Sequence, residues 1–534
     1  MRKIPSFVIY LVVTSLIYLP VLLSPVNVDP DAQLIFPMID GYQNISHYFE
    51  LLFSYMTLDV QPVRDLSLWF DWIIFKKFDV NIVIIHNVVL WAGILTVIER
   101  LTVFLFPVIK EKVNHSLVLL YGVYPLFAAS ICWGVTRKHI LAYLFILLAT
   151  EAFLKKRNLF LFTIFYFLSI FSQPITLPWP IWATLYLILN REKISAQVRL
   201  IPAYVIMIVG IIFNYKYYAY SVVFKTYYES KTENPLEVAD KFLALGHYIY
   251  QLVLPYWSAT AYQLGHHSVW IGILIFTFII LALLRTKIDR RWLMIWGSFF
   301  FFPLAVVLTN PHILSDNYLL TSSFAFFVIL IKVIEPKLND LKYGSWIFGI
   351  LLGCWGIKTY LEARLWTDPI LYAKERNFER RPNCDSAINL ARKSYLVNKK
   401  LYPEVSDFLV TQNCNEPVFK TASHAISYIY FQSYVLFYEK DFDLQKRMDT
   451  LSKLGQTTYF PKIVLATLNA QEDRRDEVDR IMNEVYSDKD QIKWSNYHEP
   501  MVAEVLAPYC LKHHMQKCLE ISSHFTVKKH VLWY

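Results

Sequence analysis

Apolar residues along this chain fall into long, nearly charge-free runs that are separated by short polar connections. About eleven of these runs come close to the roughly 20 residues that a helix needs to cross a hydrocarbon core. The predicted spans are residues 5–23, 80–98, 116–133, 140–153, 159–171, 175–189, 200–213, 269–284, 292–308, 319–334 and 346–361. The pattern therefore predicts an all-α, polytopic membrane protein.

The first run follows Arg2 and Lys3, as the apolar core of a secretory signal peptide would. Residues 24–26 read Ser-Pro-Val, which is a poor signal-peptidase site, and further apolar runs follow. We therefore predict that residues 5–23 form the first transmembrane helix.

After the last run the pattern becomes more polar and keeps a helical period. Apolar side chains recur at three-to-four spacing, as at Ala387, Leu390 and Ala391. A repeat period near thirty-odd residues is typical of tetratricopeptide units. The sequence thus predicts a membrane domain over residues 1–363 and an α-helical, tetratricopeptide-like domain over residues 364–534.

Two predicted exterior loops are long, residues 24–79 and 214–268. They contain amphipathic stretches at 42–55, 66–78 and 236–254, which suit helices lying in the membrane interface. Loops of this length are uncommon without a function, so we predict that they are binding elements.

Composition supports the membrane assignment and excludes an ordinary soluble enzyme. Of the 534 residues 55% are hydrophobic and 18% are charged, whereas soluble domains carry roughly a quarter charged residues. The net charge of +9 does not indicate nucleic-acid binding, because no basic stripe with interleaved aromatic residues lies on the soluble part. The apolar surface is instead expected to contact membrane lipid.

The positive charges predict the orientation of the chain. Every second connection is basic, and the positive-inside rule places these connections and the N-terminus in the cytoplasm. They contain Arg100, Lys110, Lys112, Lys155, Lys156, Arg157, Arg191, Lys193, Arg199, Arg285, Lys287, Arg290, Arg291, Lys332, Lys337 and Lys342. An odd number of crossings then puts the C-terminal domain outside.

Four cysteines fall in that C-terminal domain: Cys384, Cys414, Cys510 and Cys518. An even number in an exterior compartment permits disulfides. The alternative, four free buried thiols, remains open at this point, because cysteine is commonly buried without a partner.

Charges that break the membrane pattern are the candidate chemistry of the chain. Asp29 and Asp31 follow the first span on the exterior side, and Arg64 and Asp65 lie in the same loop. Carboxylates there could deprotonate an acceptor hydroxyl or, at Asp29 or Asp31, hold a divalent cation. The plainer interpretation is a solvated loop.

Arg137, Lys138 and His139 form a basic cluster in a short exterior turn, where the positive-inside rule disfavours it. A phosphate would compensate, since Arg and Lys make charge-assisted hydrogen bonds to phosphate oxygens. Anchoring to lipid headgroups or an ion pair within the protein is the alternative. Asp316 and Tyr318 open the tenth span and are further site candidates, with a helix cap as the plainer role.

Several of these segments resemble motifs of one glycosyltransferase family. Residues 124–138 resemble the motif His-Pro-x-x-x-Glu-Ser-x-x-Trp-x-x-x-Arg-Lys of bacterial relatives of the transmembrane and tetratricopeptide-repeat O-mannosyltransferases, a GT-C family. Residues 173–180 are similar to its Lys-Pro-x-x-x-Thr-Leu-Pro helix. Further likenesses, in the same order along the chain, are Asp29-Pro30-Asp31, Gln61-Pro62, His86-Asn87 and Asp316-Asn317-Tyr318.

The resemblance implies a GT-C fold and an inverting transfer from a polyprenyl-phosphate-linked sugar to a protein or glycan acceptor. It implies that Asp29 or Asp31 lies near the acceptor or a metal and that Arg137 lies near the donor phosphate. A bacterial inner membrane, with the C-terminal domain in the periplasm, fits this likeness. The sequence departs from the family where the motif has Glu, His and Arg, with Ala129, Tyr124 and Asn317.

These departures keep other functions open. A catalytically inactive, membrane-anchored helical-repeat scaffold and a surface-polysaccharide polymerase or ligase are the alternatives to an active transferase. A transporter is less favoured, because the charges lie at span ends rather than at mid-membrane.

Overall fold

The computed structural model describes the chain in the following ranges: residues 5–24, 44–53, 61–75, 80–155, 158–192, 197–220, 238–255, 270–275, 277, 288–308, 316–338, 344–379, 387, 390–391, 394, 405, 459–487 and 502–523. All regular structure in these ranges is helical, which confirms the all-α prediction for them. The chain divides into an N-terminal unit, Met1–Thr367, and a C-terminal unit, Asp368–Tyr534.

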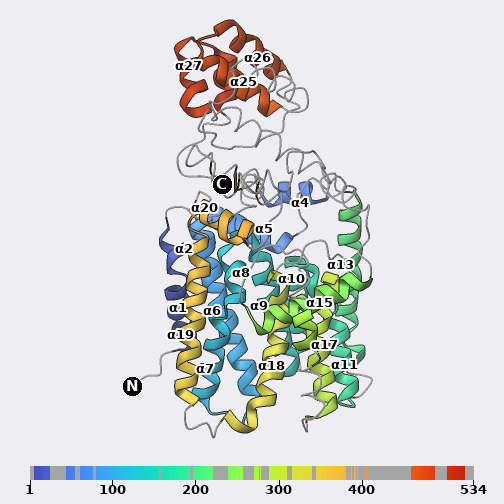
Figure 1. The fold of residues 1–534 in the computed structure, drawn as a ribbon. Coiled ribbons are helices and arrows are strands. Elements are labelled where there is room, and N and C mark those ends of the chain that lie inside the picture. Colours follow the sequence, from blue (N-terminus) through green and yellow to red (C-terminus); the bar gives the residue numbers. More distant parts are fainter. Residues whose placement is uncertain are drawn as a thin grey trace. The chain divides into compact units, whose positions relative to one another are not determined.

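The N-terminal unit is a helical bundle (Figure 1). Its longer helices are α1 (Ser6–Ile17), α6 (Val80–Leu105), α7 (Glu111–Gly122), α9 (Arg137–Leu154), α10 (Leu159–Ser172), α11 (Trp179–Leu189), α13 (Ile201–Tyr220), α17 (Arg290–Leu308), α18 (Leu319–Leu338) and α19 (Gly344–Leu365). The unit also contains α2 (Leu19–Leu23), α4 (Ile45–Phe53), α5 (Pro62–Phe75) and α15 (Val238–Val253).

Polar pairs at both ends fix the register of α6 against α9. Near one end Arg137 donates to Asn87 at 3.0 Å, and near the other Arg100 donates to Glu151 at 2.7 Å. The two contacts are separated by nearly the same number of residues on each helix, so α6 and α9 run parallel. The first pair lies at the end of the bundle covered by α5, which we call the α5 end.

The number of helices able to span a membrane is smaller than the sequence predicted. Three described helices are long and apolar enough, Val80–Leu105, Arg290–Leu308 and Leu319–Pro336, and a bent pair formed by α7 and the following short helices would make a fourth. Four further apolar helices have only 10–17 residues. The prediction of about eleven full spans is therefore wrong for the described residues, since several apolar runs are interrupted or continue outside those ranges.

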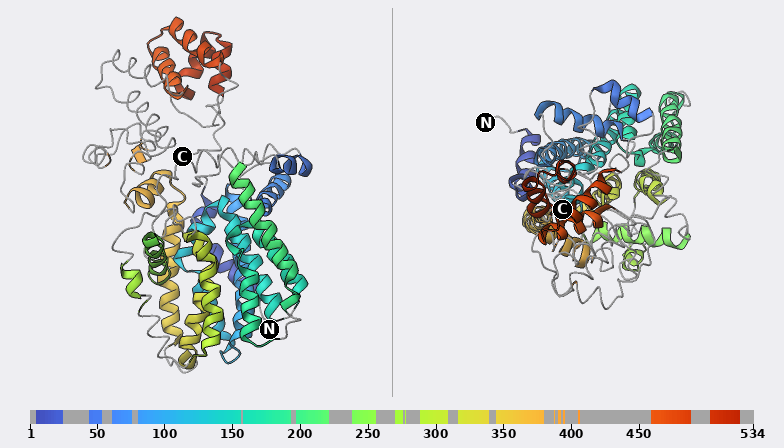
Figure 2. Two further views of the ribbon diagram at one scale, coloured as in Figure 1. Left: turned by 90° about the vertical axis from the view of Figure 1, so that its right-hand side faces the viewer. Right: turned by 90° about the horizontal axis from the view of Figure 1, so that it is seen from above.

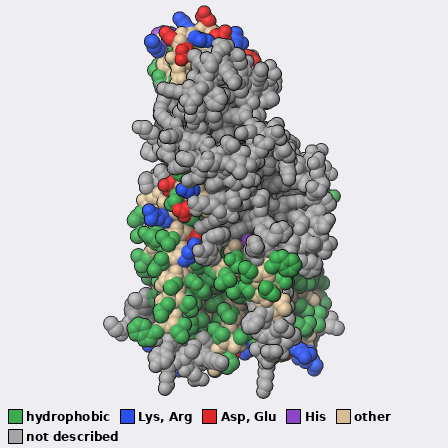
Figure 3. All heavy atoms as spheres, viewed as in Figure 1, with side chains coloured by type: hydrophobic (Ala, Val, Ile, Leu, Met, Phe, Trp, Pro, Cys, Tyr) green, Lys and Arg blue, Asp and Glu red, His purple; other side chains and the backbone are tan. Residues whose placement is uncertain are grey.

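Apolar side chains cover the outside of the bundle, as Figure 3 shows for one face. On α13, outward residues such as Ile201, Val205, Ile208 and Ile212 are about half exposed. Trp346 on α19 is 75% exposed. Contiguous apolar surface of this kind is rare on soluble monomers and is stable against lipid, which is compatible with a membrane protein.

Helices α4 and α5 lie obliquely across one end of the bundle, whereas α15 crosses its side and contacts α17 and α18 (Figures 1 and 2). The outer face of α5 carries exposed Phe70, Ile73, Ile74 and Phe75. Its inner face is charged, which is the reverse of a surface helix on a soluble protein. This arrangement is compatible with the interfacial helix predicted for residues 66–78, whose location against lipid stays a prediction.

The described part of the C-terminal unit contains two helical hairpins. The first joins α25 (Tyr459–Gln471) to α26 (Arg475–Ser487), and the second joins α27 (Ala507–Lys512) to α28 (Gln516–Ser523). Each hairpin turns at a residue with left-handed backbone, Asp473 (φ 55°) and His514 (φ 53°). These equivalent turns are 41 positions apart, which is longer than the predicted tetratricopeptide period and closer to HEAT-type repeats.

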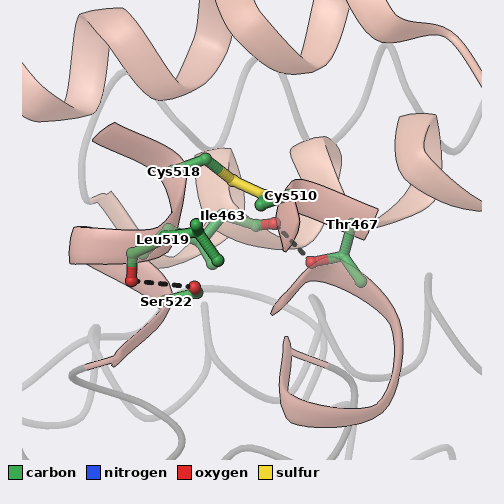
Figure 4. Close-up of a disulfide and its surroundings, with 6 residues drawn as sticks. All are labelled: Ile463, Thr467, Cys510, Cys518, Leu519 and Ser522. Atoms are coloured by element: carbon green, nitrogen blue, oxygen red, sulfur yellow. Dashed lines mark hydrogen bonds between the residues drawn. A yellow bond between two sulfur atoms is a disulfide. The ribbon is translucent and has the colours of Figure 1, made fainter. Parts of the chain in front are cut away.

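The second hairpin is closed by a disulfide between Cys510 and Cys518 (Figure 4). The sequence left open whether these cysteines form disulfides or remain free thiols. Cys510 and Cys518 form a disulfide. Cys384 and Cys414 lie outside the described residues.

Candidate functional site

The inner face of α5 carries charged residues into the bundle. Arg64, Asp65, Leu68 and Asp71 are spaced at helical intervals, and all four are buried. Arg64 donates to Asp65 through its Nε at 2.8 Å, and the Tyr48 hydroxyl of α4 lies 3.4 Å from the other carboxylate oxygen. Burial of two opposite charges side by side keeps the pair neutral, which reduces the desolvation cost.

Arg137, in the first turn of α9, crosses to this face of α5. Its Nη1 donates to Asp71 Oδ2 at 2.6 Å and to Ser67 Oγ at 3.1 Å. Its Nε donates to Asn87 Oδ1 at 3.0 Å, and its Nη2 to the Val83 carbonyl at 2.9 Å. The side chain is only 1% exposed, so its guanidinium is bound by the protein and does not face an open cavity.

Asp71 joins this arginine to a histidine on α6. Its Oδ1 lies 2.6 Å from Nδ1 of His86, while its Oδ2 accepts from Arg137. One carboxylate thus holds side chains from two other helices. We call Arg64, Asp65, Asp71, His86 and Arg137 the charge cluster.

The motif segment before Arg137 interrupts a membrane helix. Gly122 ends α7, Pro125 begins the short helix η1 (Pro125–Phe127), and α8 (Ala128–Cys132) and η2 (Gly134–Thr136) follow. The axis bends by 45° between α7 and the η1–α8 segment. We call residues 123–136 the helix break.

Carbonyl groups at and beside the helix break receive side-chain hydrogen bonds from neighbouring elements. The pairs are Trp91 Nε1 to Gly122 O (3.1 Å), Thr359 Oγ1 to Val123 O (2.6 Å), Thr136 Oγ1 to Ser130 O (2.8 Å) and Asn87 Nδ2 to Ile131 O (3.1 Å). Irregular backbone at membrane depth is tolerated only where its polar groups are satisfied within the protein. Helices α6 and α19 provide three of these partners, and Thr136 of the helix break itself provides the fourth.

The helix break meets the start of α18. Ser130 donates to Asn317 Oδ1 at 2.8 Å, and the His139 ring packs edge-on against Tyr318, with centroids 5.4 Å apart. Asn317 and Tyr318 belong to the 3-10 turn η4 (Asp316–Tyr318). Two segments that resemble family motifs, nearly 190 residues apart, therefore lie in contact.

The sequence-predicted residues are distributed as follows. Arg64, Asp65, Arg137, His139 and Tyr318 gather at the α5 end, with the half-buried Lys138 beside Arg137 and Asp316 in the same turn as Tyr318. Asp29 and Asp31 lie outside the described residues, and their predicted roles stay predictions. Arg137 and Lys138 begin α9 rather than occupying a separate turn, which places two cations at the positive end of a helix dipole.

Sequence reasoning did not assign a role to three residues that the structure brings forward. Asp71 and His86 are paired in the charge cluster, although the sequence separates them by 15 positions. Glu362 of α19 is 1% exposed and pairs with Lys358 at 2.8 Å. In the sequence these three residues lie among apolar residues. Their partners are identified only by the way the helices pack.

Two other features bear on the chemistry. Within the described ranges no group of three or more His, Cys, Asp or Glu side chains could hold a metal ion, so the predicted divalent cation stays a prediction. A groove of about 350 Å³ lies between α6, α9 and α10, and Arg100, Glu151 and Phe165 are among its lining residues. Arg100 lies 14 residues beyond His86 on α6, roughly 20 Å away, so this groove is separate from the charge cluster.

Comparison of the chain with protein-family models, curated proteins and solved structures yields no match.

Proposed function

We propose that the protein is a GT-C-type glycosyltransferase that moves a sugar from a polyprenyl-phosphate donor to an exported protein or glycan. The observation that carries the proposal is the buried charge cluster beneath helix α5, whose outer side exposes apolar residues, next to the helix break. Ionisable residues that face the interior of a membrane bundle typically mark functional sites, and broken helices typically line them.

The donor chemistry matches this position. A polyprenyl-phosphate sugar has its phosphate at the membrane face and its tail in lipid, so the site must be open to both. Lys138, half-buried in the first turn of α9, is the proposed contact for the phosphate, and the buried His139 follows it in the same turn. Arg137 has a structural role in the site, because its guanidinium already donates hydrogen bonds to Asp71 and Asn87.

The test is a transfer assay on the full-length protein in vesicles, with a labelled polyprenyl-phosphate sugar and an extract of exported proteins and glycans. Asp31→Asn and Lys138→Ala should each lower transfer roughly 100-fold, the usual size of a charge-stabilising contribution. Arg100→Ala, in the opposite-end groove, is the matched control and should transfer at the normal rate. Undiminished transfer by both site variants would remove these residues from the mechanism.

A scaffold without catalytic activity is the second candidate. It is favoured by the enclosure of Arg137 and by Ala129 and Asn317, which stand where the resembled motifs have charged residues. In this function the helical hairpins of the C-terminal unit receive an exported protein. A cell lacking residues 364–534 should then show the phenotype of a full deletion, whereas an unchanged phenotype would exclude the scaffold.

A further inference from the structure

His86 differs from its partners in the charge cluster by its access to the outside. Its side chain is 33% exposed, compared with 5% for Asp71 and 1% for Arg137. Among these three residues, contact with a substrate is therefore made through the imidazole of His86. Phe75, exposed at the end of α5, lies beside it with ring centroids 6.0 Å apart.

The geometry also determines which imidazole nitrogen is available. Asp71 Oδ2 accepts from Arg137 at 2.6 Å, and this contact stabilises the ionised carboxylate. An ionised carboxylate can only accept, so His86 Nδ1 donates its hydrogen to Asp71 Oδ1 across 2.6 Å. The neutral ring then carries its lone pair on Nε2.

We propose that His86 is the general base of the sugar transfer and that Asp71 is its positioning residue. This inference rests on the proposed function. The O–H bond of the acceptor breaks and its proton moves to His86 Nε2. The acceptor oxygen bonds to the anomeric carbon, and the bond from that carbon to the phosphate oxygen breaks, so its electron pair leaves with the polyprenyl phosphate.

The charges around His86 suit this role. The Asp71 carboxylate stabilises the imidazolium that forms after proton transfer, as an orienting carboxylate does in other histidine-dependent enzymes. Arg137, on the far side of Asp71, offsets part of that carboxylate charge. Among the described residues, Asp71 contacts His86 directly, and Arg137 is linked to His86 through Asp71.

A second histidine–carboxylate pair, between His115 of α7 and Glu99 of α6, is the matched control. His115 Nδ1 lies 3.2 Å from Glu99, and its side chain is 23% exposed. Glu99 is 13 residues beyond His86 on α6, which places this pair roughly 20 Å away, toward the opposite end of the bundle. His115→Gln therefore changes a similar pair without touching the charge cluster.

The experiment compares kcat and KM for transfer by the wild type, His86→Gln, Asp71→Asn and His115→Gln in vesicles, across the pH range in which histidine titrates. His86→Gln should lower kcat roughly 100-fold with little change in KM and should abolish the loss of rate at acid pH. His115→Gln should match the wild type. A His86→Gln protein that keeps both its rate and its acid limb would overturn the general-base role.

A measurement on the folded wild type avoids dependence on variants. Diethyl pyrocarbonate should modify His86 and abolish transfer, and hydroxylamine should restore both, with the modified peptide identified by mass spectrometry. Full transfer by protein modified at His86 would also overturn the inference. A wild type that transfers no sugar from any polyprenyl-phosphate donor would instead refute the proposed function, and the role of His86 would fall with it.

Discussion

At the scale of single residues, buried charges dominate the N-terminal unit. Arg137 makes hydrogen bonds to two side chains and two backbone carbonyls besides its ion pair with Asp71. Each bond to a charged group contributes about 1.5–3 kcal/mol, but the larger effect is the cost of leaving one charge unpaired. The pair is therefore a structural necessity whatever the reaction is.

We expect Arg137→Met to lower the free energy of unfolding by about 3–5 kcal/mol, because Asp71 would be left buried without its cation. Arg100→Met removes a comparable arginine–carboxylate pair, yet Arg100 is 48% exposed, so the expected loss is only about 0–1 kcal/mol. Chemical unfolding of both variants in detergent measures the difference. Equal losses would show that the Arg137 pair is solvated.

His247 in α15 makes the stability depend on pH. Its side chain is 3% exposed, and burial lowers the pKa of its imidazole from 6.5 to about 4. Between these values the unfolded chain binds a proton that the folded chain does not, so stability falls as pH drops from about 6.5 toward 4. The expected loss is about 2 kcal/mol at pH 5.

The apparent melting temperature of the wild type in detergent should accordingly fall between pH 7 and pH 5 by more than that of His247→Gln. The glutamine keeps a polar side chain of similar size but binds no proton. The same decrease in both proteins would contradict the neutral, buried histidine.

At the scale of elements, the sequence predicted one continuous span over residues 116–133, and the structure shows a helix broken near Pro125. A proline lacks the N–H of a regular helix, which frees carbonyl groups upstream. Trp91 of α6 and Thr359 of α19 donate to the upstream carbonyls of Gly122 and Val123. Asn87 of α6 donates to the Ile131 carbonyl beyond the proline.

Thr359→Val should therefore destabilise the protein by about 1–3 kcal/mol, because the Val123 carbonyl would lose this buried partner. Thr163→Val is the control, since the Thr163 hydroxyl bonds only the Leu159 carbonyl within its own helix. We expect that control to change stability by less than about 0.5 kcal/mol. Thermal unfolding followed by circular dichroism distinguishes the two.

At the scale of the whole molecule, the two units have chemically different surfaces. The N-terminal unit exposes apolar helix faces, whereas the C-terminal unit has charged helix surfaces and a disulfide. Disulfides persist in oxidising compartments. The exterior location that the basic connections predict for the C-terminal unit stays a prediction, which the Cys510–Cys518 bond makes testable by labelling.

Alkylation of intact cells tests this organisation. Cys510 and Cys518 should react with a maleimide only after reduction, whereas the exposed free thiol of Cys354 on α19 should react without it once the membrane is dissolved. Reduction should also destabilise the C-terminal unit by roughly 2–3 kcal/mol, because the unfolded chain gains entropy. Labelling of Cys510 before reduction would exclude the disulfide and weaken the exterior assignment.

The sequence by itself determined what depends on local composition. Apolar runs predicted the helices, the change of pattern near residue 364 lies close to the division at Thr367, and the cations at Arg137 and Lys138 were identified as misplaced charges. Hydrophobic content along the chain is sufficient for these inferences, because a helix in lipid satisfies its own backbone.

Only the tertiary structure decided which polar groups meet. Asp71 bonds Arg137 across 66 positions, and Ser130 bonds Asn317 across 187. Neither separation has a periodic signature, since such pairs arise from the packing and register of whole helices. The same packing broke the predicted third span and enclosed Arg137, because a buried charge is stable only where several helices bring it partners.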